Sequence, residues 1–176
     1  AARTAGTLSG TNTVCSNGTT TLSSTVLGGT WTSSNTAVAT INSTSGLVAG
    51  IATGSAIMTY TILGTGGCSN ATATRTITVT SAPTAGLLAG TQTICFNETT
   101  TFTSTVAGGA WTSGNTSIAT INSLTGAIAV VSAGATTMTY TVTGTGGCSN
   151  ATLNRTLTIN PIPNPFPFIS DVTPVP

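Results

Sequence analysis

The segment GGTWTSSNTAVATIN at residues 28–42 returns 80 residues later as GGAWTSGNTSIATIN at residues 108–122. The same offset of 80 relates the cysteines, the methionines and the tyrosines, and residues 4–83 match residues 84–163 at more than half of their positions without a gap. A repeat of this length indicates a duplicated domain. The sequence therefore predicts two domains, residues 1–83 and 84–160, followed by a proline-rich, extended tail at residues 161–176.

Short runs in each repeat alternate between apolar side chains and Thr or Ser, with Gly- and Asn-rich turns between them. In residues 56–63, for example, Met58, Tyr60 and Ile62 alternate with threonines. Such alternation is typical of strands with one buried face, and no segment has helical periodicity. The first repeat is thus predicted to hold seven strands, at residues 4–14, 19–26, around Trp31, 38–41, 47–49, 56–63 and 68–80. The expected fold class is all-β, with a sandwich in each repeat.

Charged side chains are unusually scarce in this chain of 176 residues, and histidine and lysine are absent. The five charged residues are Arg3, Arg75, Glu98, Arg155 and Asp171. Three separated arginines cannot replace the counterions of a nucleic acid or bind an anionic membrane surface, so neither partner is expected. Apolar residues are dispersed, which argues against membrane insertion.

The same scarcity excludes the common catalytic and metal-binding arrangements. A Ser-His-Asp triad needs a histidine, and a pair of catalytic carboxylates needs two neighbouring acidic residues, of which the first repeat has none. Metal sites need clusters of Cys, His or carboxylates, and none is present. We therefore expect no enzymatic activity, no catalytic residues, no bound metal and no cofactor.

The motifs around the two tryptophans resemble those of a known family. The segments WTSSNTAVATIN at residues 31–42, SGLVAG at 45–50 and GSAIMTYT at 54–61 are similar to the bacterial immunoglobulin-like domain, group 2, in particular to the cysteine-containing tandem versions in large surface proteins of the Bacteroidetes. The resemblance covers residues 4–160. It implies two tandem immunoglobulin-like β-sandwiches related by the 80-residue repeat, used as modules of extracellular adhesins and fibres, with no shared catalytic site. The Asp residues common in that family's turns are missing here.

Aromatic and basic side chains have more than one interpretation. Trp31 and Trp111 could stack on sugars, but their place after a Gly-Gly corner favours the core tryptophan of an immunoglobulin-like sandwich. Tyr60 and Tyr140 are interpreted as core or corner residues. Arg75 and Arg155 stand among outward threonines of the last strand, and we interpret them as solvated edge residues that oppose mispairing.

The cysteines Cys15, Cys68, Cys95 and Cys148 lack the spacing of metal or redox motifs, so disulfides in an oxidising, extracellular setting are expected. Five strand traversals separate the turn at Cys15 from the turn at Cys68, which puts these residues at opposite ends of one sandwich. A disulfide needs α-carbons within about 7 Å, so this odd number of traversals, the strand parity, disfavours a bond between Cys15 and Cys68. In an end-to-end stack, the end of the first domain that bears Cys15 would meet the end of the second domain that bears Cys148. Strand parity therefore favours an interdomain bridge between Cys15 and Cys148, leaving Cys68 and Cys95 for neighbouring modules. Pairing within each repeat, Cys15 with Cys68 and Cys95 with Cys148, stays open, because an irregular first strand would break the parity count.

Two features point to self-association or to covering glycans. Thr-rich strands without lysine leave sheet edges unprotected, so the edges either associate or are covered. Candidate glycosylation sites of the form N-x-S/T occur at Asn17, Asn42, Asn70, Asn97, Asn115, Asn150 and Asn154, although a Thr-rich chain contains several by chance.

Three functions are consistent with these patterns. The favoured one is a structural module of an extracellular fibre, stalk or giant adhesin at the cell surface, stacked end to end with identical or homologous modules and stabilised by disulfides. The alternative is a pilus-like subunit that lends a terminal segment to a neighbour's sheet, either residues 1–14 or the tail with Phe166, Phe168 and Ile169. A carbohydrate-binding module that uses the tryptophans is the third.

Overall fold

The computed structural model describes residues 3–163, whose regular elements are all β-strands. The chain divides into two compact units. The first comprises the residues up to Ala85 together with Thr141–Thr152, and the second comprises Gly86–Tyr140 and the chain from Leu153 onward. Phe166, Phe168 and Ile169, the predicted strand-addition residues, lie outside the described residues.

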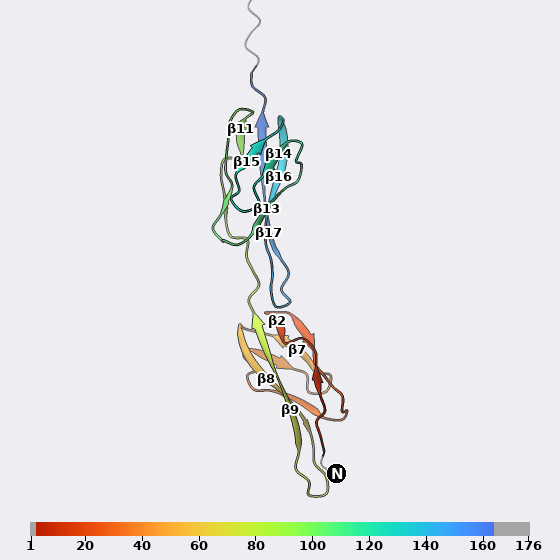
Figure 1. The fold of residues 1–176 in the computed structure, drawn as a ribbon. Helices are drawn as coiled ribbons and strands as arrows, with labels where there is room; N and C mark the ends of the chain where they lie inside the picture. Colours follow the sequence, from red (N-terminus) through yellow and green to blue (C-terminus); the bar gives the residue numbers. More distant parts are fainter. Residues whose placement is uncertain (1–2, 164–176) are drawn as a thin grey trace, which may run out of the picture. The chain divides into compact units, whose positions relative to one another are not determined.

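The first unit is a sandwich of a four-stranded and a three-stranded sheet, with a short two-stranded sheet beside them (Figure 1). The four-stranded sheet has the order β2-β9-β8-β5, the three-stranded sheet β3-β7-β6, and the short sheet β1-β4. The bounds are β1 Leu8–Ser9, β2 Thr13–Cys15, β3 Thr19–Thr21, β4 Ser23–Ser24, β5 Thr30–Ser33, β6 Ala39–Ile41, β7 Leu47–Gly50, β8 Gly54–Ile62 and β9 Ala71–Thr80.

Alternating residues of the two larger sheets form the core of the first unit. In β8, Ala56, Met58, Tyr60 and Ile62 are buried while Ile57 is exposed, as the period of two predicts. They pack with buried residues of the other strands and of the loop after β3, namely Val14, Leu22, Trp31, Ala39, Val48, Ile77 and Val79. Burial of these side chains is the main contribution to the stability of the unit.

The second unit repeats this plan with small changes. Its sheets have the orders β11-β17-β16-β13, β14-β15 and β10-β12. The third strand of the smaller sheet is reduced to a single bridge between Thr101 and Ala127. The bounds are β10 Leu88–Ala89, β11 Thr93–Cys95, β12 Thr103–Ser104, β13 Ala110–Ser113, β14 Ala119–Ile121, β15 Ile128–Val130, β16 Gly134–Val142 and β17 Ala151–Asn160.

The first two strands predicted in each repeat are divided in the structure, which corrects the prediction of seven strands. Residues 4–14 contain β1 and most of β2, and residues 19–26 contain β3 and β4. The strands on the two sides of each break have different partners. At the first break, β1 pairs with β4 whereas β2 pairs in parallel with β9. At the second break, β3 pairs with β7 whereas β4 pairs with β1. The chain thus crosses between sheets at both points.

Candidate functional site

Side chains that could carry chemistry are few and separate. The described residues contain no group of three or more His, Cys, Asp or Glu side chains that could hold a metal ion. They also contain no helix long and apolar enough to cross a membrane. Glu98 is the one acidic residue in residues 3–163, and its Oε2 accepts a hydrogen bond from the backbone N–H of Cys95 at 2.8 Å.

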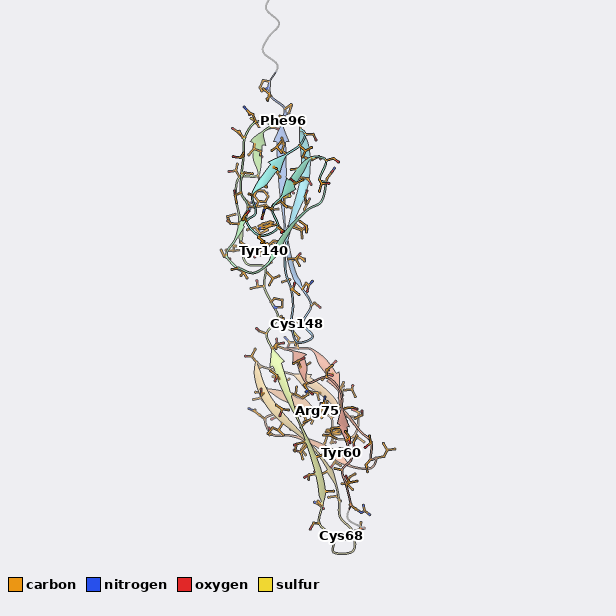
Figure 2. All side chains as sticks on the ribbon, in the orientation of Figure 1. Tyr60, Cys68, Arg75, Phe96, Tyr140 and Cys148 are labelled. Atoms are coloured by element: carbon orange, nitrogen blue, oxygen red, sulfur yellow. A yellow bond between two sulfur atoms is a disulfide. The ribbon has the colours of Figure 1, made fainter. Side chains whose placement is uncertain are left out.

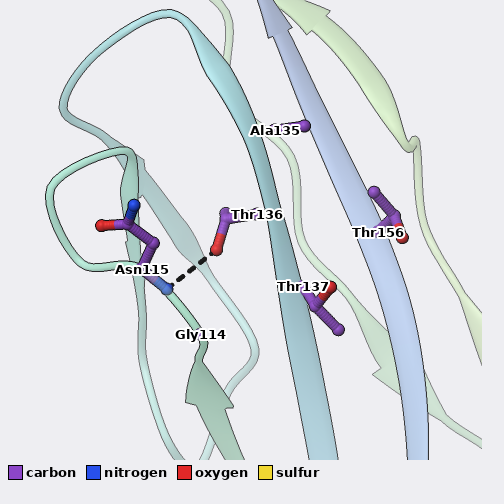
Figure 3. A pocket seen from close by; sticks show the side chains of 6 residues that line it. All are labelled: Gly114, Asn115, Ala135, Thr136, Thr137 and Thr156. Atoms are coloured by element: carbon purple, nitrogen blue, oxygen red, sulfur yellow. Dashed lines mark hydrogen bonds between the residues drawn. The ribbon is translucent and has the colours of Figure 1, made fainter.

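A hollow of about 290 Å³ in the second unit is lined by backbone and small polar side chains, from Gly114, Asn115, Ala135, Thr136, Thr137 and Thr156. Figure 3 shows the hydroxyl of Thr136 bonded to the backbone N–H of Asn115, at 2.9 Å. Gly114 stands where the first repeat has Ser34. No charged or nucleophilic group lines the hollow beyond threonine hydroxyls, so we assign it no chemical role.

The two tryptophans belong to the core, as the immunoglobulin-like interpretation predicts. Trp31 and Trp111 are only 4% and 3% exposed. Each packs against the tyrosine of the neighbouring strand, with ring centroids 4.7 Å apart for Trp31 and Tyr60 and 4.9 Å apart for Trp111 and Tyr140. Neither ring offers a face to a sugar, so the carbohydrate-binding hypothesis built on them is not retained.

The tyrosine hydroxyls hold the Gly-Gly corners. The hydroxyl of Tyr60 donates to the carbonyl of Val26 at 2.9 Å and accepts from the N–H of Gly29 at 2.8 Å. Tyr140 makes the same two bonds, to Val106 at 2.6 Å and from Gly109 at 2.9 Å. These are corner tyrosines, as the sequence predicts.

Arg75 and Arg155 are not solvated edge residues, and that prediction is wrong. They lie on β9 and β17, which are inner strands of their sheets. The guanidinium of Arg75 donates to the carbonyls of Leu8 and Gly10, and its Nε is buried without a partner. Arg155 binds Leu88 and Gly90 in the same way and lies 5.4 Å from the ring centroid of Phe102. Each arginine therefore satisfies one carbonyl in the first strand of its unit and one just after that strand.

A disulfide joins Cys15, at the end of β2, to Cys148, in the hairpin between β16 and β17, with α-carbons 4.8 Å apart. This is the pairing that strand parity favours. Both residues belong to the first unit, because Thr141–Thr152 is part of it. Figure 2 shows Cys68 at the end of this unit opposite to Cys148, which is why Cys15 does not pair with Cys68.

Hairpin residues beside Cys148 fit closely against the end of β9. The hydroxyl of Thr80 donates to the carbonyl of Thr145 at 3.2 Å. A β-carbon on Gly146 would lie 2.5 Å from that hydroxyl oxygen, so only glycine allows this approach. The contact is thus built by the backbone of the hairpin as well as by the disulfide.

The other two cysteines form no disulfide within the chain. Cys68 is exposed in the hairpin between β8 and β9, and Cys95 is half-buried at the end of β11. These positions are equivalent to Cys148 and Cys15 by the repeat offset of 80. Their pairing with neighbouring modules stays a prediction.

All seven candidate glycosylation residues are exposed: Asn17, Asn42, Asn70, Asn97, Asn115, Asn150 and Asn154. Several also brace turns through the side-chain oxygen. Asn42 Oδ1 accepts bonds from the N–H groups of Thr44 and Ser45, at 3.0 and 2.9 Å. The amide nitrogens, to which a glycan is attached, are not needed for these bonds.

Segment 1–14, one candidate for strand addition, pairs with the chain's own strands where it is described. Leu8–Ser9 pairs with β4, and the strand Thr13–Cys15, which begins inside this segment, pairs with β9. Strand addition through the tail stays a prediction.

No protein-family model matches the sequence, and a comparison with curated proteins finds no significant match. Among solved structures, the chain is similar to the C-terminal 282-residue fragment of intimin, which was solved in complex with the intimin-binding domain of the translocated intimin receptor. The identity is 14%, the TM-score is 0.54, and the match covers 88% of this chain and 64% of that one. This likeness, with the all-β structure, shows a fold of two tandem immunoglobulin-like β-sandwiches.

Two further matches have lower TM-scores. Domains 1–6 of the surface layer protein SbsC match with 18% identity and a TM-score of 0.42, over 94% of this chain and 29% of that one. A SusE-like, surface-located polysaccharide-binding protein from the heparin utilisation locus of Bacteroides thetaiotaomicron matches with 13% identity and a TM-score of 0.36, over 88% and 34%. The chain thus spans less than two thirds of the length of each of the three proteins.

Proposed function

We propose that this chain is a structural module of an extracellular fibre, stalk or giant adhesin, built from cysteine-containing tandem versions of the bacterial immunoglobulin-like domain, group 2. Its modules are residues 1–83 and 84–160, and we propose that such modules stack end to end with identical or homologous ones. The function is mechanical: the module spans distance and resists extension at the cell surface.

The observation that carries this proposal is the disulfide between Cys15 and Cys148, which are separated by 133 residues in the sequence. A pull on the two ends of the chain passes from residue 15 through the disulfide to residue 148. The residues between them, which include nearly all of both cores, lie outside this covalent path. A bridge placed in this way suits a module that must stay folded under tension.

Composition and fold support the same function. A chain with two acidic residues, three arginines and no histidine has little means of catalysis, whereas Thr-rich sandwiches with short connections are well suited to serial arrays. Pro83, in the short connection between the repeats, restricts one backbone torsion. Intimin, whose fragment has the same fold, was solved with a receptor domain, which supports an adhesin as the larger protein. We propose homologous modules as partners, and glycans on the exposed asparagines.

Immunogold labelling of intact producing cells tests the proposal, with antibodies raised against the purified chain. We expect gold particles on the cell surface, in rows along fibres or at a distance from the envelope. Permeabilised cells serve as the comparison. Label that appears only after permeabilisation, or only in the cell-free medium, would overturn the proposal.

A further inference from the structure

Cys68 lies in a hairpin that is identical in sequence to the hairpin of Cys148. Both read GTGGCSNAT, at residues 64–72 and 144–152. Their glycines also share the left-handed conformation, with φ of 64° at Gly66 and 62° at Gly146. In each, the first glycine donates its N–H to the asparagine side chain, at 2.9 Å for Gly64 and 3.0 Å for Gly144. The Cys68 hairpin therefore has the shape of one that already occupies a binding site.

Cys95 lies at a strand end built like the one that receives Cys148. In the first unit, β2 runs parallel to β9 with Cys15 opposite Thr80, and Ser16 donates to the carbonyl of Thr80 at 2.8 Å. In the second, β11 runs parallel to β17 with Cys95 opposite Asn160, and Phe96 donates to the carbonyl of Asn160 at 3.0 Å. Cys95 therefore has the same backbone surroundings as Cys15 but no disulfide partner.

Apolar side chains beside Cys95 are exposed where the first unit has small ones. Phe96, in place of Ser16, is 41% exposed, and Ile162, in place of Ala82, is 56% exposed. Figure 2 places Phe96 at the end of the second unit toward which β17 runs. Exposed apolar groups just beyond the ends of two paired strands favour a surface that another molecule covers.

Two of the chain's five charges lie beside these two cysteines and have opposite signs. The guanidinium of Arg3 binds the Cys68 hairpin, at 3.1 Å from the carbonyl of Leu63 and 3.0 Å from the hydroxyl of Thr65. Glu98 binds the backbone of Cys95. The equivalent positions at the Cys15–Cys148 disulfide, Pro83 and Gly18, carry no charge.

We propose that Cys68 of one copy of this chain forms a disulfide with Cys95 of a second copy, and that Arg3 and Glu98 face one another across the joint. The hairpin of residues 64–72 then occupies the end of β11 and β17 as the Cys148 hairpin occupies the end of β2 and β9. Repetition of this head-to-tail contact gives a polymer rather than a closed dimer. The inference rests on the proposed function and names the partner module.

The bond forms by thiol–disulfide exchange. The Cys68 and Cys95 thiols together lose two protons and two electrons, and a small-molecule disulfide such as oxidised glutathione accepts them and becomes two thiols. The sulfur–sulfur bond of the oxidant breaks as the bond between the two copies forms.

Two variants, each of which keeps one of the two joining cysteines, test the pairing. Cys95→Ser keeps Cys68, and Cys68→Ser keeps Cys95, so neither variant alone can extend a chain. We expect an equimolar mixture in oxidised and reduced glutathione to give a heterodimer in large excess over either homodimer, with a linked Cys68–Cys95 peptide in mass spectrometry. Heterodimer and homodimers in statistical proportion, or no dimer, would overturn the proposal.

Charge reversal tests the recognition of one end by the other. Glu98→Arg in the Cys68→Ser variant should lower the rate of heterodimer formation by about two- to fivefold, as expected for a surface ion pair. Arg3→Glu in its partner should restore the rate, and added salt should remove the difference. If neither charge reversal changed the rate, the proposal that Arg3 and Glu98 face one another across the joint would be wrong.

Two glycine variants test the close fit of the hairpin: Gly66→Ala is the test and Gly28→Ala is its matched control. Gly66→Ala should reduce the heterodimer, because a β-carbon at the equivalent Gly146 meets Thr80, whereas Gly28→Ala should not. Both glycines have positive φ and open space around them in the single chain. A linked Cys15–Cys148 peptide in every variant verifies folding.

The outcomes for the joint and for the proposed function can be told apart. If no Cys68–Cys95 heterodimer forms although the cell surface is labelled, only this joint is rejected, whereas absence of surface label would reject the proposed function.

Discussion

Tyr60 and Tyr140 show how one hydroxyl group can fix a corner of each sandwich. Each bridges a carbonyl two residues before a Gly-Gly pair and the N–H of the second glycine of that pair. The side chains are almost fully buried, so water cannot take over both bonds when the hydroxyl is absent.

Tyr60→Phe should therefore lower the free energy of unfolding by about 1–3 kcal/mol, the cost of leaving buried polar groups without partners. The repeat supplies the matched variant, because Tyr140→Phe removes the same two bonds from the second unit. Urea unfolding followed by tryptophan fluorescence measures both. An unchanged midpoint in either variant would contradict the role of that hydroxyl.

Arg75 acts as an internal clamp rather than as a surface charge. Arg75→Met keeps most of the side-chain volume but leaves the carbonyls of Leu8 and Gly10 without their donor. We expect a loss of about 2–3 kcal/mol, the usual worth of hydrogen bonds to a charged group. Arg3→Met is the control, since Arg3 is exposed and its loss should change stability by less than about 0.5 kcal/mol. Equal effects of the two variants in urea unfolding would contradict the clamp.

The sequence could predict which residues are buried but not what Arg75 binds. The burial of Trp31, Tyr60 and Met58 could be predicted because their alternation and spacing are visible in the sequence close to them. Arg75 stands among threonines in the same kind of alternation, and nothing nearby reveals that residues 8–10 lie over it. Its partners are 65 and 67 residues away in the chain, so the prediction failed where the contact was distant.

At the scale of the elements, the divided strands have the same explanation. Residues 19–26 keep their alternation through the break, with Leu22 buried and its neighbours exposed. Alternation reports which face is buried, but it does not report which strand supplies the hydrogen bonds. β3 and β4 therefore looked like a single strand, although they belong to different sheets.

The hairpin between β16 and β17 is the element that closes the covalent loop. Cys148→Ser should lower the free energy of unfolding by up to about 5 kcal/mol in the chain-entropy account, since the bonded residues are 133 apart in the sequence. The matched variant is Cys68→Ser, which changes the identical hairpin of the first repeat and should leave the unfolding midpoint of the monomer unchanged. Similar midpoints for both variants would show that the disulfide contributes no stability.

At the scale of the whole molecule, duplication sets the architecture. The repeat offset of 80 predicted equivalent cores, corners and hairpins, and the structure has them at equivalent residues. Two of the sequence differences between the repeats lie beside equivalent cysteines. Gly18 and Ser16 beside the bonded Cys15 become Glu98 and Phe96 beside Cys95.

The most direct measurement of the mechanical function is force-extension of a single chain held at its two termini, with Cys68 and Cys95 replaced by serine to prevent polymerisation. With the disulfide intact, only the residues outside the loop can extend, and full stretching should give about 150 Å at roughly 3.5 Å per residue. With a reducing agent present, the same pull should give about 600 Å at that length per residue. Equal extensions in the two conditions would contradict the claim that the Cys15–Cys148 bridge carries the load.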